Sequence, residues 1–167
     1  MIDLPLLIYE LGIIFENQKN YDDAVSYYKK AVNLKPKYSN ALLGLGICFF
    51  RQNLLEKAKD FFEKSLESNP NNPKVYANLG AVYEKLGNYE TAIEILNIAI
   101  KLNPGNAMAF FNLGIAYEKA GNKNEAIRCY ENAVKLNHQR KEIIKNKINE
   151  LKKGLGTASY SYSANIK

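Results

Sequence analysis

The stretch ANLGAVYEKLGNYETAI at residues 77–93 returns thirty-four positions later as FNLGIAYEKAGNKNEAI at residues 111–127. The residues Asn, Leu, Gly, Tyr, Glu, Lys, Gly, Asn, Ala and Ile occupy the same places in both copies. Catalytic groups are seldom duplicated at a fixed offset. A fixed period of this length indicates an array of structural units.

The same register divides most of the chain into four units, residues 5–38, 39–72, 73–106 and 107–140. Apolar residues recur at spacings of three and four within each unit, which predicts two amphipathic helices per unit. The eighth position of every unit is glycine and the twentieth is alanine: Gly12, Gly46, Gly80 and Gly114, then Ala24, Ala58, Ala92 and Ala126. Such small residues favour a close crossing of the two helices.

The turn between the two helices also has a recognisable pattern. In the last two units it reads Gly-Asn, at residues 87–88 and 121–122, which is typical of a left-handed helix end followed by an N-cap. The first two units keep the spacing with Lys19-Asn20 and Asn53-Leu54. Asn72-Pro73 places a capping residue before a proline at a first helical position.

This pattern closely resembles the tetratricopeptide repeat (TPR) family over about residues 4–140. The resemblance implies an all-α fold, a right-handed α-solenoid of four tandem helix–turn–helix TPR units. Residues 141–153 place Ile144, Ile148 and Leu151 on one helix face, so we interpret them as a C-terminal capping helix. Residues 154–167 are small and polar, and we expect a flexible tail there.

The formal net charge is +6, which raises the question of nucleic acid. Residues 138–153 hold +4 and Lys167 adds one, so residues 1–137 carry only 6 − 4 − 1 = +1. Nucleic-acid binding is therefore not the favoured interpretation, although the Lys-rich helix remains an alternative site for an acidic surface. The chain has no apolar run near the ~20 residues that span a bilayer, so we expect no membrane segment.

We find no constellation of catalytic, metal-binding or cofactor-binding residues, so an enzyme is not expected. The only histidine, His138, stands where other units have proline, and we expect it to be solvated. Cys48 is expected to pack as a small hydrophobe, and Cys129 to be partly exposed. The two cysteines follow no zinc or redox spacing, which is typical of a cytoplasmic protein.

The TPR resemblance implies that the first helices of the units line a concave groove for an extended peptide or a partner helix. Several positions of this groove are apolar here, more than scattered exposed hydrophobes would explain. Asn78 and Asn112 offer donors and acceptors to a peptide backbone. The candidate groove residues are Tyr9, Ile13, Leu43, Ile47, Phe50, Lys74, Asn78, Met108, Phe111, Asn112 and Ile115.

Some TPR co-chaperones hold the C-terminal carboxylate of a heat-shock protein with a set of Lys, Asn and Arg residues. Counted from the second unit, Leu43 and Ile47 replace the first Lys and Asn of that set. Counted from the first unit, Tyr9 and Ile13 replace them. We therefore expect no carboxylate clamp, and an apolar anchor fits the groove better.

Our leading hypothesis is a non-enzymatic interaction module that serves as a scaffold or assembly adaptor. The alternative is a regulatory or substrate-targeting TPR portion of a larger enzyme. The first helix has no apparent cap and is expected to expose Leu4, Leu7 and Ile14. This exposure fits either a portion of a longer array or self-association through the first helix.

Overall fold

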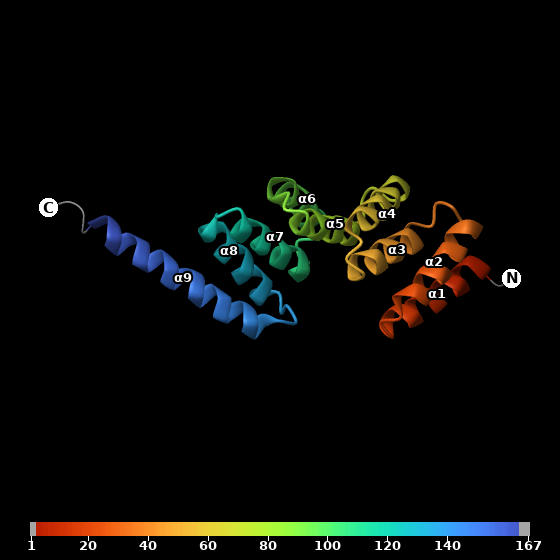
Figure 1. Ribbon diagram of the computed structural model, residues 1–167, viewed down its shortest axis with the longest axis horizontal. Helices are drawn as coiled ribbons and strands as arrows, with labels where there is room; N and C mark the ends of the chain where they lie inside the picture. Colours follow the sequence, from red (N-terminus) through yellow and green to blue (C-terminus); the bar gives the residue numbers. More distant parts are fainter. Residues whose placement is uncertain (1–2, 164–167) are drawn as a thin grey trace.

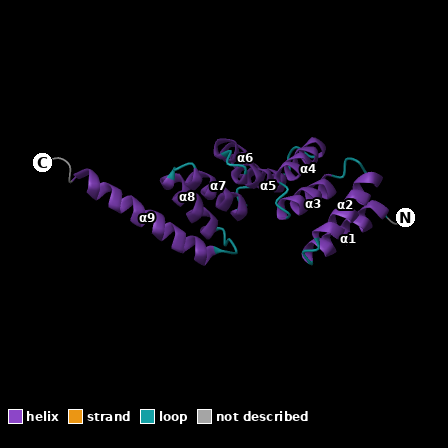
Figure 2. Cartoon of the chain, viewed as in Figure 1, coloured by secondary structure: helices purple, strands orange, loops and turns teal. Residues whose placement is uncertain are grey.

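The computed structural model of the protein describes residues 3–163, and the regular structure in this part of the chain is entirely α-helical (Figure 2). Figure 1 shows the helices in chain order along an elongated array, with α1 and α9 at opposite ends. The expected all-α solenoid is confirmed. The helices are α1 (Leu4–Asn17), α2 (Tyr21–Leu34), α3 (Ser39–Arg51), α4 (Leu55–Ser68), α5 (Pro73–Lys85), α6 (Tyr89–Leu102), α7 (Ala107–Lys119), α8 (Lys123–Lys135) and α9 (Lys141–Ser163).

The helices pack in four pairs, α1–α2, α3–α4, α5–α6 and α7–α8, and each helix also contacts the next one in the chain. The first helices of neighbouring units approach one another, because α1 and α3, α3 and α5, and α5 and α7 have Cα atoms within 8 Å. Within residues 3–163, no two second helices come that close. The array therefore curves toward its first helices, and we call the face formed by α1, α3, α5 and α7 the inner surface.

The repeated glycines lie where the two helices of a unit cross. A Cβ atom added to Gly12 or Gly114 would lie 2.5 Å from the ring of Tyr28 or Tyr130. A Cβ atom added to Gly46 would lie 2.4 Å from Phe62, and one added to Gly80 would lie 2.5 Å from Leu96. The alanines at the twentieth position are all fully buried. Small residues are thus required at the crossing because a large side chain of the second helix fills the space.

The turns follow the predicted backbone but not all of the predicted caps. Gly87 and Gly121 have φ angles of +81° and +84°, in the left-handed region that glycine accepts readily. In other units Lys19 and Asn53 take the same conformation. The asparagines that follow Gly87 and Gly121 stand at N-cap positions, but their side chains accept no capping hydrogen bond, so that interpretation was wrong.

Helix α9 is longer than predicted. It continues to Ser163, ten residues past the expected end at residue 153, so the segment predicted as a flexible tail is helical over residues 154–163. Residues 164–167 lie outside the described residues. Ile144 and Ile148 are buried, as the predicted capping face required, and Leu155 adds a further contact with the C-terminal core. Each residue added to an existing helix forms one more backbone hydrogen bond. Together with the contact of Leu155, this favours the extension of α9.

Candidate binding surface

Five of the predicted groove residues form one apolar patch at the N-terminal half of the inner surface. They lie on α1 and α3, are half-buried, and pack against the same core cluster. The ring of Tyr9 lies 5.7 Å from that of Tyr28 and 5.1 Å from that of Tyr38, measured between centroids. Each residue therefore supports the core while keeping part of its side chain accessible. We call this set the N-terminal patch: Tyr9, Ile13, Leu43, Ile47 and Phe50.

A lysine from the next unit borders the N-terminal patch. The Nζ atom of Lys85, on α5, lies 5.2 Å from the ring centroid of Phe50. A cation over an aromatic face is attracted by the electron density of the ring. The patch is thus apolar at its centre and positively charged on the side that faces α5.

The apolar groove residues of the fourth unit belong to a different cluster. Phe111 and Ile115 of α7 are half-buried and pack against a core that includes Ile144 and Ile148 of α9. Met108, near the start of the same helix, is 42% exposed. We call Met108, Phe111 and Ile115 the C-terminal patch. The predicted groove residues therefore lie on one surface but in two separate apolar groups.

The two predicted asparagines already use one hydrogen-bond donor within the protein. Asn78 donates from Nδ2 to the carbonyl oxygen of Lys74, at 2.8 Å, and Asn112 donates to that of Ala77, at 3.3 Å. The second bond joins α7 to α5. A carboxamide has two N–H donors and an oxygen acceptor, so each side chain keeps one donor and its oxygen for a ligand.

His138 is buried, so the expectation of a solvated histidine was wrong. Its side chain is 4% exposed, and its ring lies 4.7 Å from that of Phe111. Its Nδ1 accepts a hydrogen bond from the backbone N–H of Arg140, at 3.1 Å, which assigns the proton of the neutral ring to Nε2. Burial lowers the pKa of His138, and the charge of Arg140 lowers it further. Phe111 thus packs against the buried ring of His138.

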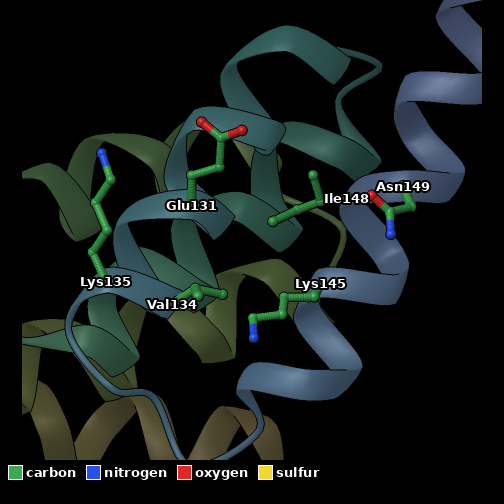
Figure 3. Close-up of a pocket in the computed structure, with 6 residues that line it drawn as sticks. All are labelled: Glu131, Val134, Lys135, Lys145, Ile148 and Asn149. Atoms are coloured by element: carbon green, nitrogen blue, oxygen red, sulfur yellow. The ribbon is translucent and has the colours of Figure 1, made fainter.

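Three cavities lie around the fourth unit and α9. One, of about 460 Å³, is bordered by Lys74, Met108 and His138 at the start of α7. A second, of about 310 Å³, lies between α7 and α9 beside Phe111 and Ile115. A third, of about 370 Å³, lies between α8 and α9 (Figure 3), where its lining residues are Glu131, Val134, Lys135, Lys145, Ile148 and Asn149. The C-terminal patch therefore adjoins hollows that could receive side chains of a partner.

The lysines of α9 do not form an open basic stripe. Lys145 pairs with Glu142 of the same helix at 3.0 Å. Lys147 pairs with Glu118 of α7 at 3.1 Å, and Lys152 with Glu131 of α8 at 2.8 Å. The pairs of Lys147 and Lys152 attach α9 to the fourth unit, and all three pairs neutralise charge that a nucleic acid would need.

The part of the chain that the structure describes contains no cluster of three or more His, Cys, Asp or Glu residues arranged to hold a metal ion. Both cysteines are free thiols, and both are buried. Cys48 packs in the core as predicted, whereas Cys129 is less exposed than expected, at 8%. No helix among the described residues combines the length and the apolar character needed to cross a membrane.

Sequence reasoning missed the residues that α9 and the turn before it add beside the C-terminal patch. Arg140, Ile143 and Lys147 line the cavity between α7 and α9, together with Phe111 and Ile115. The only sequence signal was Ile143, a second isoleucine next to Ile144 that does not belong to the predicted capping face. It is 67% exposed, the largest exposed fraction among the exposed large apolar residues of the described chain.

Comparisons with known proteins agree with this architecture. Two family models, each described as a tetratricopeptide repeat, match residues 17–81 and 72–137. A crystal structure of MamA is 26% identical with a TM-score of 0.72, and the match covers 84% of this chain and 82% of that one. The structure of TTC0263, a thermophilic TPR protein in Thermus thermophilus, is 22% identical with a TM-score of 0.78, covering 91% and 83%. No curated protein gives a significant match.

Proposed function

The chain belongs to the tetratricopeptide repeat family, and from this premise we propose that it is a non-enzymatic module whose inner surface binds an extended peptide or a partner helix. Repeats of this family are protein-interaction and scaffold modules in general. The finer proposal concerns the ligand, the residues that hold it, and a role as an assembly adaptor in the cytoplasm.

The observation that carries the proposal is the position of the half-exposed apolar residues. Leu43, Ile47 and Phe50 follow one side of α3, and Tyr9 and Ile13 continue this strip onto α1. All five belong to first helices, which approach one another from unit to unit. An apolar strip of this kind offers area to a partner, and burying one such side chain contributes about 1.5–3 kcal/mol before the costs of association.

The polar groups of the inner surface support backbone recognition in the third and fourth units. Asn78 and Asn112 keep a free donor and acceptor each, and their internal hydrogen bonds hold them in position. A preorganised carboxamide loses less conformational freedom on binding than a mobile one. The proposal retains the expectation of no carboxylate clamp, because Leu43 and Ile47 are apolar where that clamp needs Lys and Asn.

The test is a peptide-display selection on the full chain, followed by affinity measurements on single variants. Met108→Ala and Phe50→Ala should each weaken the selected peptides by roughly 5- to 30-fold, which corresponds to about 1–2 kcal/mol of lost apolar contact. The double variant Asn78→Ala/Asn112→Ala should weaken them further. Fluorescence anisotropy gives the Kd, and thermal unfolding verifies that each variant is folded.

The matched control is Ile98→Ala. Ile98 lies on α6, a second helix, and is 41% exposed, almost the same fraction as Met108. Its truncation removes a similar apolar area from a face outside the inner surface, so the affinity should not change. Peptides that bind equally well to the Met108, Phe50 and asparagine variants would reject the proposal.

A further inference from the structure

We infer that α9 is part of the binding site, and that the cavity between α7 and α9 receives an apolar side chain of a peptide segment whose neighbouring residues are acidic. This inference rests on the proposed function and names the partner that one part of the inner surface fits. It gives α9 a second role beside covering the core of the fourth unit.

The apolar part of this cavity's lining comes from two helices, α7 and α9. Phe111 and Ile115 of α7 face Ile143 and Ile144 of α9 across a volume of about 310 Å³. Although Cα atoms of α5 and α7 lie within 8 Å of each other, no such approach joins α7 to α9 among the described residues. The wider separation leaves room for a partner's side chain at this step of the array.

Ile143 is the feature that a purely structural role of α9 does not explain. Ile144 is fully buried and Ile148 is 7% exposed, so these two isoleucines cover the core. Ile143, however, is 67% exposed and lines the cavity. A ligand that covers both this side chain and the cavity would remove the most apolar surface from water.

The charges around the cavity favour a ligand that carries negative charge. Its lining includes three cations, Lys119, Arg140 and Lys147, and one carboxylate, Glu118, for a net charge of 3 − 1 = +2. Glu118 is already used, because it pairs with Lys147 at 3.1 Å and accepts a hydrogen bond from Tyr130 at 2.7 Å. Lys119 and Arg140 form no ion pair in the described part of the chain. Two positive charges therefore remain for acidic groups of a ligand.

A third cation without an ion pair in the described part of the chain extends the positive rim toward the start of α7. Lys74 borders the neighbouring cavity together with His138, and the ring of His138 lies against Phe111, which borders the cavity between α7 and α9. No salt bridge of Lys74 is present among the described residues. An anchor beside Phe111 would thus have cations on both sides, so acidic residues before and after the anchor fit the site.

The cavity on the other side of α9 lacks this charge excess. There, two of the lining residues drawn in Figure 3 form ion pairs: Glu131 pairs with Lys152, and Lys145 pairs with Glu142. Only Lys135 remains as a charged lining residue without an ion pair in the described part of the chain. It provides a matched control, because it is an exposed lysine near α9 that faces a different cavity.

The experiment uses the full chain and three pools of fluorescein-labelled synthetic peptides of equal length. Each peptide carries one central Phe or Leu, and the flanking residues are Asp and Glu, Lys and Arg, or Ser and Asn. We expect the acidic pool to bind most tightly in fluorescence anisotropy. Its advantage should shrink as the NaCl concentration rises, because salt screens exposed charges.

The variants locate the site on the protein. The double variant Lys119→Glu/Arg140→Glu should transfer the preference from the acidic to the basic pool. Ile143→Ser should weaken the binding of the acidic pool by about tenfold, a common loss when a large interface side chain is truncated. The variant should remain folded, because Ile143 is largely exposed. Lys135→Glu reverses one charge beside the other cavity and should leave the ranking of the pools unaltered.

The outcomes separate this inference from the proposed function. Equal binding of the three pools, or an acidic preference that survives the Lys119/Arg140 double variant, would overturn the inference. If display-selected peptides then lose affinity with Phe50→Ala but not with Ile143→Ser, the inner surface binds peptides without α9, and only the inference fails. If no pool and no selected peptide binds the chain, both proposals fail.

Discussion

The first and fourth units build their cores around the same four positions. The fifth residue is aromatic, the eighth is glycine, the twelfth is glutamate and the twenty-fourth is tyrosine. In both units the two aromatic rings are 5.7–5.9 Å apart, and the tyrosine donates a hydrogen bond of 2.6–2.7 Å to the glutamate. The residues are Tyr9, Gly12, Glu16 and Tyr28 in one unit and Phe111, Gly114, Glu118 and Tyr130 in the other.

What differs is the element that follows each unit. In the first unit, α3 brings Gly44 against the free side of the Tyr28 ring, where an added Cβ would lie 2.6 Å away. In the fourth unit, α9 follows, and the cavity of about 310 Å³ remains beside Phe111. The same core is thus closed when another unit follows it, whereas a cavity remains beside it when α9 follows. A binding site can therefore be specific to this junction, although the core residues of the two units are nearly the same.

The largest effect should come from removing the tyrosine rings. Tyr28→Ala and Tyr130→Ala each delete a fully buried aromatic side chain, a change that costs about 3–5 kcal/mol in protein cores. The cost of Tyr28→Ala should lie at the upper end of this range, because helices enclose the ring on both sides. The cost of Tyr130→Ala should lie at the lower end, because α9 can move into the space left by the ring. Urea denaturation gives the free energies of unfolding, and hydrogen exchange shows whether one end opens alone.

Tyr28→Phe and Tyr130→Phe are the controls, because they keep the ring and remove only the hydrogen bond to the glutamate. Each should cost about 1.5–3 kcal/mol, the usual net contribution of a hydrogen bond to a charged group. Alanine variants of equal cost at the two sites would contradict the comparison. So would a larger loss for Tyr130, since its surroundings would then be the more rigid ones.

A smaller effect, which depends on pH, should distinguish the fourth unit. The pKa of His138 is lowered by burial and by the charge of Arg140. The unfolded chain therefore binds more protons at this site below about pH 6.5, so stability falls as the pH decreases through that value toward the folded-state pKa. In urea denaturation, His138→Phe should remove this part of the loss between about pH 6.5 and 5, while keeping a ring against Phe111.

Tyr38→Phe is the corresponding change in the first unit. Tyr38 lies 5.1 Å from the ring of Tyr9, as His138 lies 4.7 Å from that of Phe111. Its pKa is raised, by burial first, so its hydroxyl stays protonated throughout the acidic range. This variant should therefore follow the pH dependence of the unaltered chain. The same pH dependence in the unaltered chain and in His138→Phe would contradict the assignment to His138.

The sequence was sufficient for the parts of the fold that depend on local spacing. Gly12 and Gly114 marked the helix crossings because no larger residue fits beside Tyr28 and Tyr130. The period of thirty-four also located the turns, even at Lys19, where the residue type alone favours no left-handed turn. The hydrogen bond between glutamate and tyrosine in the first and fourth units was not predicted, although the second unit differs there, with Phe50 and Phe62 at those positions.

The parts that the sequence did not predict have two causes: the residue types of the tail, and the distances between helices. The tail contains glycine, serine and threonine, which are weaker helix formers than alanine, so its helix was not expected. His138 was assigned to a solvated linker because its contact with Phe111 follows from the position of α9. The cavity beside Phe111 has the same origin. Residues of α9 line it, and periodicity alone does not state how far a capping helix stands from the helix before it.

The smallest effect concerns the two thiols, one in each half of the molecule. Burial raises the pKa of Cys48 to about 12 and that of Cys129 to about 11, with further contributions from Glu16 and Glu125. The thiolate is the reactive form, so both should react slowly with Ellman's reagent at neutral pH. Cys129 is 8% exposed, whereas Cys48 is fully buried in the closed part of the array, so Cys129 should react first. The variants Cys48→Ala and Cys129→Ala assign the two phases. If Cys48 reacted first, or if both matched the rate of the urea-unfolded chain, the N-terminal half would open more readily than its packing indicates.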